Sequence, residues 1–470
     1  MSLLLAASAS APGKLILFGE HAVVYGHTAI AAAISDMRVS VDAQLVLGEQ
    51  VLCISLLDIP SSKTCYPPLT FRVELSELRT VLGGIAPLPH WTRPAQPEQA
   101  AIQALSTLLE DVHEEDLPAL LPVLYLAAGI MPQLLHPSWT GGLNLQVRSA
   151  KLPVGAGLGS SAAFSVSLSA ALLRLQLLCV SMAAEAPESL LAQARDAMSP
   201  AGQRLASLLQ THDIDGRSAR PSPTAKQLIN AWAYSSECIL HGTPSGLDNS
   251  VSCYGEAVKL MRAAPAEALL FEPVKRFPKL QVLLTNTKVP RKTREQVSGV
   301  RRLHESLPSV TIPVFEAISS VADAFLDLIS GGSVEGAALA QIGRLVSMNH
   351  ALLTVLGVSA PALQLVCDVA GKHGLPTKLT GAGGGGCAFS ILGGEEELDS
   401  SMETRVQRCS RTLRSHRFDC YRTTVGGEGV LWHEPEQEAA RARPPSSPRL
   451  LVASLIAAGV VAAALVSRRR

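Results

Sequence analysis

The sequence lacks the features that mark several common classes of protein. Its nine cysteines are odd in number and form no CxxC pair, which argues against a disulfide framework and a structural zinc site and suits a reducing compartment. Basic and acidic residues both number 40, and no basic run contains interleaved aromatic residues, so we expect no nucleic-acid partner. No basic segment precedes the first apolar run, so we interpret the N-terminus as a strand and not as a signal peptide.

The chain contains enough apolar sequence for a large core, since 47% of its 470 residues are hydrophobic. The apolar patterns predict strands at 14–18, 39–47, 143–147, 258–260 and 280–285, and helices at 226–239, 314–329 and 337–356. A further core helix is predicted from Leu120 to Leu135, with Pro122 in its first turn and Pro132 ending or kinking it.

Composition suggests how the chain is divided into domains. We predict a first unit at 1–259, with a surface insertion at about 181–225 where proline, serine and acidic residues gather, and a second α/β unit at 260–434. Residues 435–449 are rich in proline, serine and charge, which is typical of a disordered linker. Residues 450–466 form an uncharged apolar stretch that could be a C-terminal membrane anchor.

Three glycine-rich segments carry most of the functional information: APGKLILFGEHAVVYG (11–26), PVGAGLGSSAAFS (153–165) and KLTGAGGGGCAFSIL (378–392). Glycine allows positive φ and close approach of the backbone to a ligand. The middle segment precedes an apolar run, 162–178, which predicts a buried helix whose N-terminus would favour a phosphate. No lysine follows its last glycine, so it is not a Walker A loop, and a glycine-rich turn before a core helix remains the alternative.

All three segments, in this order, resemble those of the GHMP small-molecule kinases. Two further stretches, Glu237–Ser252 and Leu283–Val297, make the resemblance strongest to the mevalonate kinase family. The resemblance covers roughly 8–432 and is weak across 36–145 and 181–225. It implies an α+β, two-domain GHMP kinase fold, with an N-terminal domain like ribosomal protein S5 domain 2, a ferredoxin-like C-terminal domain, and the site between them.

The activity implied by this resemblance is ATP- and Mg²⁺-dependent phosphorylation of the C5 hydroxyl of mevalonate. The products would be 5-phosphomevalonate and ADP, an early step in isoprenoid and sterol biosynthesis. Asp248 lies in PSGLDN (244–249), which predicts a tight turn, and the resemblance assigns Asp248 and Lys14 as catalytic residues. Such a carboxylate can accept or orient the hydroxyl proton, and the cation can polarise the hydroxyl. The alternatives are an Asx-turn or N-cap aspartate and a solvated lysine at a strand start.

The resemblance also implies the residues that hold the nucleotide and its metal ion. The nucleotide-binding residues would be Lys14, Gly155, Ala156, Gly157, Leu158, Gly159, Ser160 and Ser161. Mg²⁺ takes one or two protein oxygens besides phosphates, and Ser161 with Glu237 would supply them. Whether Ser160 or Ser161 is the metal ligand stays open, and so does a solvated helix carboxylate as the role of Glu237.

On the substrate side, the implied residues are Glu20, His21, Thr243, Thr380, Gly381 and Ala382. His21 could donate to the mevalonate carboxylate or to a hydroxyl, or could be a structural residue. The basic residues Lys288, Arg291 and Lys292 could hold a phosphate or carboxylate, and an ordinary surface turn is the alternative. For the glycine run 381–386, the alternative is a flexible surface loop.

The partners implied by the resemblance are the small molecules mevalonate and ATP, a second copy in a homodimer, and prenyl diphosphates as inhibitors that compete with ATP. We expect a cytoplasmic kinase body. The stretch 450–466 would be about 25 Å long as a helix, at the short end for a membrane span, and Arg449 and three final arginines flank it. A tail anchor in the mitochondrial outer membrane or the peroxisome, with the endoplasmic reticulum as an alternative, is the hypothesis; a core or amphipathic helix is its rival.

Two other functions stay open at this point. One is another GHMP kinase, acting on phosphomevalonate or on a sugar. The other is a catalytically silent member of the family that serves as a membrane-associated binding protein. The presence of Lys14, Ser161, Glu237 and Asp248 argues against this second alternative.

Overall fold

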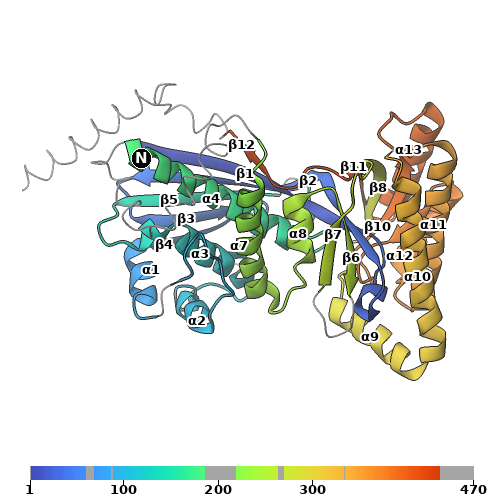
Figure 1. The fold of residues 1–470 in the computed structure, drawn as a ribbon, viewed down its shortest axis with the longest axis horizontal. Helices are drawn as coiled ribbons and strands as arrows, with labels where there is room; N and C mark the ends of the chain where they lie inside the picture. Colours follow the sequence, from blue (N-terminus) through green and yellow to red (C-terminus); the bar gives the residue numbers. More distant parts are fainter. Residues whose placement is uncertain are drawn as a thin grey trace, which may run out of the picture.

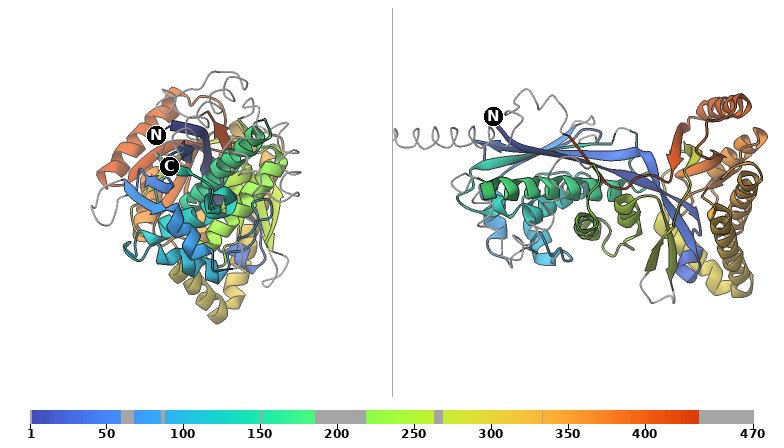
Figure 2. Two further views of the ribbon diagram at one scale, coloured as in Figure 1. Left: turned by 90° about the vertical axis from the view of Figure 1, so that its left-hand side faces the viewer. Right: turned by 45° about the horizontal axis from the view of Figure 1, so that its top comes forward.

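The computed structural model describes residues 2–59, 68–85, 88–149, 151–185, 219–262, 269–332 and 334–434. Two long antiparallel strands, β1 (Ser2–Phe18) and β2 (Ala29–Leu47), form the backbone of the fold and are joined through the 3-10 helix η1 (Ala22–Tyr25). Both strands run from one lobe of the molecule into the other (Figures 1 and 2). The predicted strands at 14–18 and 39–47 are confirmed as parts of them.

The first lobe is built on β2 and the strands beside it. The strand order is β4 (Leu69–Glu74), β3 (Val51–Leu56), β5 (Gly141–Arg148) and β2, in which only the β3–β5 pair is parallel. One face of this sheet is covered by α1 (Leu75–Leu82), α2 (Gln99–Thr107), α3 (Leu117–Ile130), α4 (Ser160–Glu185), α7 (Pro223–His241) and α8 (Leu247–Tyr254) (Figure 1). The alternating burial of β2 explains this arrangement, because its apolar residues face these helices.

The second lobe has an antiparallel sheet with helices beside it. Its strands follow the order β9 (Thr377–Leu379), β10 (Cys387–Gly393), β8 (Leu280–Asn286) and β11 (Asp419–Val425). Its helices are α9 (Thr293–Ser306), α10 (Pro308–Ile329), α11 (Gly336–Val355), α12 (Pro361–Lys372) and α13 (Ser400–Ser415). The predicted α+β class is therefore confirmed. The predicted strand at 280–285 and the predicted helices at 314–329 and 337–356 are also confirmed, except that residue 356 is the C-cap of its helix and not part of it.

The pairing of β2 with β11, at Ile34 and Val425, joins the strands of the two lobes into one twelve-stranded sheet, and two further strands pair with β1 and β2. β6 (Ala257–Arg262) pairs with the start of β2 and with β7 (Leu269–Pro273), next to the predicted boundary at 259/260. β12 (Leu431–His433) returns from the second lobe to pair with β1 at Ser8–Ser10. The exact division into domains stays a prediction, because the strands on both sides of it belong to the same sheet.

The core helix α3 differs from its predicted bounds. It begins at Leu117 and ends at Ile130, so that Pro118, and not Pro122, lies in its first turn. Pro122 lies inside the helix, where its ring removes a single backbone hydrogen bond, and burial of the residues from Pro122 to Ile130 offsets that loss. Pro132 does end the helix, because it begins a short 3-10 turn. Of the predicted insertion at 181–225, residues 186–218 lie outside the described residues.

One helix of the described residues is long and apolar enough to cross a membrane by length and composition, at Ser160–Ser181 in α4. The fold buries 89% of that window, and α4 packs against β1, β2 and α7. It is therefore the central helix of the first lobe's core, and its N-terminus is the end that reaches the site described next.

Candidate active site

A cleft of about 1010 Å³ lies where the ends of β1, α7, α8 and α9 meet the third glycine-rich segment. The predicted site residues that line it are Lys14, Glu20, His21, Ser161, Glu237, Thr243, Asp248, Gly381 and Ala382. These residues come from segments far apart in the chain, and the fold brings them to one place. Thr380 does not line the cleft: its hydroxyl donates to Ile16 O at 2.9 Å and accepts from Ile16 N at 3.1 Å.

Lys14 and Asp248 form an ion pair at the centre of this cleft, with 3.2 Å between Lys14 Nζ and Asp248 Oδ1. Lys14 follows a register shift in β1, and its backbone N–H donates to Leu158 O at 2.7 Å, which fixes the strand against the middle glycine loop. Asp248 lies in the first turn of α8, whose N-cap is Gly246 with φ 77°, and not in a tight turn as predicted. An acidic residue in the first turn of a helix interacts favourably with the helix dipole.

The middle glycine loop leads directly into α4. Gly155, Gly157 and Gly159 all have left-handed φ, of 74°, 83° and 71°, which confirms that this backbone needs glycine. A Cβ on Gly159 would lie 2.8 Å from Lys14 Cγ, and one on Gly157 would overlap the guanidinium of Arg291. Two cations therefore lie directly against the loop at the N-terminus of a 26-residue helix, where anions bind well.

Ser161 and Glu237 lie side by side, as the predicted metal role requires. Ser161 Oγ donates to Glu237 Oε2 at 3.4 Å, and Ser165 Oγ donates to Glu237 Oε1 at 3.0 Å. Burial, together with the negative charge of Asp248, raises the pKa of Glu237 to about 7. His241 Nε2 lies 3.3 Å from Ser161 Oγ. A buried carboxylate with a raised pKa is a group whose charge a cation would stabilise.

Sequence reasoning missed Ser165 and His241, although a signal was present. Each lies four residues after a predicted residue on the same helix, Ser165 after Ser161 and His241 after Glu237. Residues four apart on a helix share one face. The spacing could therefore have added both of them to the site.

The substrate-side residues are held by contacts between the first and third glycine-rich segments. His21 Nε2 lies 2.9 Å from Ala382 O, and burial lowers the pKa of His21. Both oxygens of Glu20 are engaged, one in an ion pair with Lys378 and the other accepting from Asn349 Nδ2 at 3.1 Å. Glu20 therefore has its carboxylate directed into the protein, although the residue lines the cleft.

The structure separates the three basic residues of the 288–292 segment. Lys288 pairs with Asp419 at 2.8 Å and Lys292 with Glu295 at 3.0 Å, and both lysines are more than half exposed. Arg291 alone lines the cleft. Burial lowers its pKa, and its Nε has no hydrogen-bond partner among the described residues. Its guanidinium is thus positioned for an anionic ligand.

The third glycine run is packed backbone and not a flexible surface loop. All five of its glycines, at 381 and 383–386, have positive φ. A Cβ on Gly383 would overlap Val358 O, and one on Gly386 would overlap the Arg291 side chain. Thr287 Oγ1 donates to Gly386 O at 2.7 Å. The run therefore places Gly381 and Ala382 against the cleft by close approach of one backbone to another.

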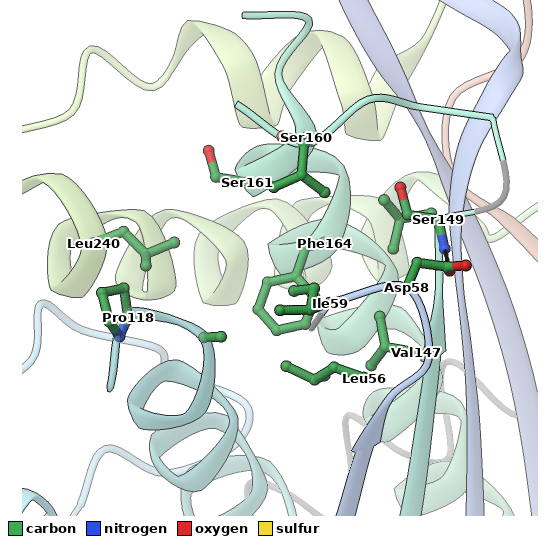
Figure 3. Close-up of a pocket in the computed structure, with 13 residues that line it drawn as sticks. Leu56, Asp58, Ile59, Pro118, Val147, Ser149, Ser160, Ser161, Phe164 and Leu240 are labelled. Carbon is green, nitrogen blue, oxygen red and sulfur yellow. Dashed lines mark hydrogen bonds between the residues drawn. The ribbon is translucent and has the colours of Figure 1, made fainter. Parts of the chain in front are cut away.

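A second cavity, an apolar slot of about 190 Å³, lies on the other side of Ser161 (Figure 3). Its walls include Leu56, Ile59, Val147, Phe164 and Leu240, with Ser160 and Ser161 at one end. Asp58 lies at its edge and accepts a hydrogen bond from the backbone N–H of Ser149. Most of these wall residues come from the stretch 36–145 and its flank, where the resemblance is weak, so no sequence motif indicated them.

The chain is similar to known families, proteins and solved structures. Models described as GHMP kinases N terminal domain and GHMP kinases C terminal match residues 124–196 and 334–402. The mevalonate kinase of Homo sapiens is 33% identical over 428 residues, covering 90% of this chain and 94% of that protein, and that of Mus musculus is 33% identical over 439 residues, covering 90% and 94%. The L. major mevalonate kinase crystallised with R-mevalonate has the same fold, with a TM-score of 0.57 and 17% identity over 89% of this chain and 96% of that one.

Proposed function

The chain belongs to the mevalonate kinase family, and from this premise we propose that its cleft transfers the γ-phosphoryl group of ATP to the C5 hydroxyl of mevalonate. The products are 5-phosphomevalonate and ADP, and the reaction is an early step of isoprenoid and sterol biosynthesis. The observation that carries this proposal is the Lys14–Asp248 pair, which lies open to the cleft directly beside the glycine loop.

Phosphoryl transfer depends on positioning and on neutralising charge, since the transferred group itself needs little covalent assistance. The Asp248 carboxylate orients the acceptor hydroxyl and accepts its proton as the O–P bond forms. Lys14 Nζ, 3.2 Å away, holds that carboxylate in place. Arg291, which lies against Gly157, supplies a second fixed positive charge for the phosphate oxygens.

The donor set fits a magnesium ion held together with the nucleotide. Ser161 Oγ and Glu237 Oε2 are hard oxygen ligands 3.4 Å apart, and Mg²⁺ usually takes one or two protein oxygens besides phosphates and waters. No cluster of three or more His, Cys, Asp or Glu side chains forms a metal site within the described ranges, so the proposed ion would depend on the phosphates as well. A bound Mg²⁺ would neutralise charge on the phosphates, and Glu237 and Ser161 would hold it.

The apolar slot is the proposed site of the nucleotide base. It adjoins Ser160 and Ser161 at the start of α4, so a base in the slot would place its phosphates at the glycine loop (Figure 3). Apolar walls such as Phe164 and Val147 suit a flat ring, and Asp58 offers an acceptor at the edge. Ser161 lines both cavities, which makes it the point where nucleotide and acceptor meet.

The acceptor would occupy the part of the cleft between Asp248 and His21. His21, Thr243, Gly381 and Ala382 line that region, and His21 Nε2 is fixed by its contact with Ala382 O. Thr380 is proposed to act through the Ile16 backbone and not on the substrate, because its hydroxyl is already engaged there.

A coupled ADP-release assay on the purified protein tests the proposed reaction. We expect turnover with mevalonate and ATP, and little or none when phosphomevalonate or galactose replaces mevalonate at the same concentration. Turnover with one of these instead of mevalonate would assign the cleft to another GHMP kinase activity. Absence of ADP release with all three acceptors, from protein that binds ATP, would favour the silent-member alternative.

Two regulatory properties remain proposals that rest on the family alone. We propose a homodimer and competition between prenyl diphosphates and ATP. Light scattering at several protein concentrations measures the first. Inhibition by farnesyl diphosphate at rising ATP measures the second, and an inhibition that does not weaken as ATP rises would contradict it.

We also propose that the kinase body is cytoplasmic and that 450–466 anchors it to a membrane, the mitochondrial outer membrane or the peroxisome in preference to the endoplasmic reticulum. The support is the uncharged apolar sequence between Arg449 and the final arginines, which lies outside the described residues. Carbonate extraction of cells expressing the full chain, or a form ending at Glu434, tests it. Full-length protein found wholly in the soluble fraction would contradict the anchor and leave the kinase assignment untouched.

A further inference from the structure

A buried ion pair behind the cleft joins two segments that are 358 residues apart. Lys378 Nζ donates to Glu20 Oε1, and the side chains are 0% and 1% exposed. Asn349 Nδ2 donates to the other Glu20 oxygen at 3.1 Å. The rings of Phe18 and Phe389 lie 5.8 and 5.3 Å from the ammonium. One carboxylate and two aromatic faces therefore enclose the charge of Lys378.

Stability alone does not account for this pair. Moving two charges out of water is costly, and well-packed apolar residues in place of a buried ion pair are often neutral or stabilising. Burial lowers the pKa of Lys378, and the negative charge of Glu20 opposes that shift. Asn349 Oδ1 is buried beside the pair without a hydrogen-bond partner in the described part of the chain. Because one buried polar atom of this cluster lacks a hydrogen-bond partner, we expect the cluster to have a role other than stabilisation.

The pair belongs to a set of contacts between the same two segments, which run from Ile16 to His21 and from Lys378 to Ala382. Thr380 Oγ1 donates to Ile16 O at 2.9 Å, and His21 Nε2 lies 2.9 Å from Ala382 O. In the first segment Glu20 lies between these two contacts, whereas in the second segment Lys378 precedes both. The ion pair is the only one of the three contacts that joins opposite charges. His21 and Ala382, at the far end of the set, line the cleft.

His21 needs such support because of its backbone. Its φ is 63°, in the left-handed region that residues other than glycine adopt at a cost. Conformations of this kind persist where the surroundings hold them. The residue before His21 is Glu20, whose side chain is fixed at both oxygens. The ion pair therefore acts directly on the backbone that carries the His21 ring.

We propose that Lys378 is a positioning residue for the acceptor half of the active site. Its ion pair with Glu20 clamps the two segments, so that His21 and Ala382 keep the geometry that receives the acceptor. Lys378 is fully buried and does not line the cleft. This inference rests on the proposed function only where it identifies the acceptor as mevalonate.

The double variant Glu20→Gln/Lys378→Met tests the clamp. Lys378→Met alone would leave an unpaired buried carboxylate, whereas the double variant removes both charges and keeps side chains of similar size. The matched control is Lys279→Met, which breaks an exposed pair with Glu395 away from the cleft. Steady-state kinetics on all three proteins would vary mevalonate and ATP separately. We expect the double variant to raise the KM for mevalonate about tenfold and to leave the KM for ATP within about twofold, while the control matches the unmodified protein.

Amide hydrogen exchange supplies a second reading that needs no substrate. We expect faster exchange in 16–22 and 380–386 of the double variant, with β8 unchanged. An unchanged KM for mevalonate together with unchanged exchange would overturn the proposal, as would an equal rise of both KM values. If the unmodified protein does not use mevalonate, the proposed function is wrong, and hydrogen exchange alone then decides whether the clamp exists.

Discussion

The two walls of the cleft each contain a lysine paired with a carboxylate, and the two pairs differ in burial. The Lys14–Asp248 pair has side chains 8% and 36% exposed, whereas the Glu20–Lys378 pair has values of 1% and 0%. A partly open pair can exchange one partner for a substrate hydroxyl or a phosphate oxygen. A closed pair cannot, so its effect reaches the substrate only through the backbone that it holds. We therefore propose that burial, and not residue type, separates the catalytic pair from the positioning pair in this site.

The largest expected effect comes from removing the charge of the open pair. Asp248→Asn should lower kcat by about 10²- to 10⁴-fold, because the acceptor hydroxyl loses the group that takes or orients its proton. Binding of ATP should change little, since Asp248 lies outside the apolar slot. Steady-state kinetics and calorimetric ATP titration measure both quantities. If Asp248→Asn kept a kcat near that of the unmodified protein, the open pair would have no catalytic role, and the proposed difference between the two pairs would be wrong.

A second effect concerns the stability of the ligand-free protein as the pH changes. The folded state raises the pKa of Glu237 from 4.5 to about 7, so the folded protein binds more protons than the unfolded chain between these values. Stability should therefore fall as the pH rises through this window, by on the order of 3 kcal/mol relative to Glu237→Gln. Urea unfolding at pH 4.5 and 7.5 measures it, with Glu295→Gln as an exposed control. If the unfolding free energies of Glu237→Gln and of the unmodified protein changed equally between the two pH values, burial would not raise the pKa of Glu237 as described.

The second and third glycine-rich segments allow a matched test of packing. Gly155 and Gly383 have nearly the same φ, 74° and 77°, but a Cβ meets open space at Gly155 and overlaps Val358 O at Gly383. Alanine at either position should cost about 1 kcal/mol of unfolding free energy for the left-handed backbone. Gly383→Ala should cost about 2 kcal/mol more, because the neighbouring backbone has to move. Denaturant unfolding measures both variants. If Gly155→Ala and Gly383→Ala lost equal unfolding free energy, the backbone of the third glycine run would relax easily around the added Cβ.

The smallest expected effect separates two neighbouring hydroxyls. Ser161 Oγ donates to Glu237, and Ser161 lines both cavities, whereas Ser160 lines only the slot. Ser161→Ala should therefore raise the Mg²⁺ concentration for half-maximal activity about tenfold, through loss of one hard oxygen ligand, and Ser160→Ala should raise it less. Magnesium titrations at fixed ATP measure this difference. A larger shift for Ser160→Ala would exchange the two assignments.

The sequence predicted the residues that local motifs specify. Lys14, Ser161, Glu237 and Asp248 each lie in a short segment with a clear pattern, and the fold brings all four to one cleft. The position of Asp248 in a helix was not predicted, because the glycines before it suggested a turn and the helix that follows is only eight residues long. Whether each residue has its assigned role stays a prediction that the variants above test.

The contacts that depend on tertiary packing could not be predicted. Lys378 and Glu20 are far apart in the chain, and nothing local to either residue indicates that they meet. The slot is formed by Leu56, Ile59 and Val147, ordinary apolar strand and loop residues whose meeting with α4 only the fold determines. Thr380 appeared to be a substrate-side hydroxyl because it adjoins the glycine run, yet its partner is the β1 backbone.

The return of β12 to β1 has a consequence for how the chain folds during synthesis. Ser10 Oγ lies 2.7 Å from His433 Nε2, and Trp432 Nε1 donates to Ala170 O at 3.3 Å, so the last described strand completes the core of the first lobe. The first lobe cannot reach its final form until the ribosome has released His433, more than 420 residues after Ser10. Until then β1 has an unpaired edge there, of the kind that chaperones protect in slowly assembled sheets.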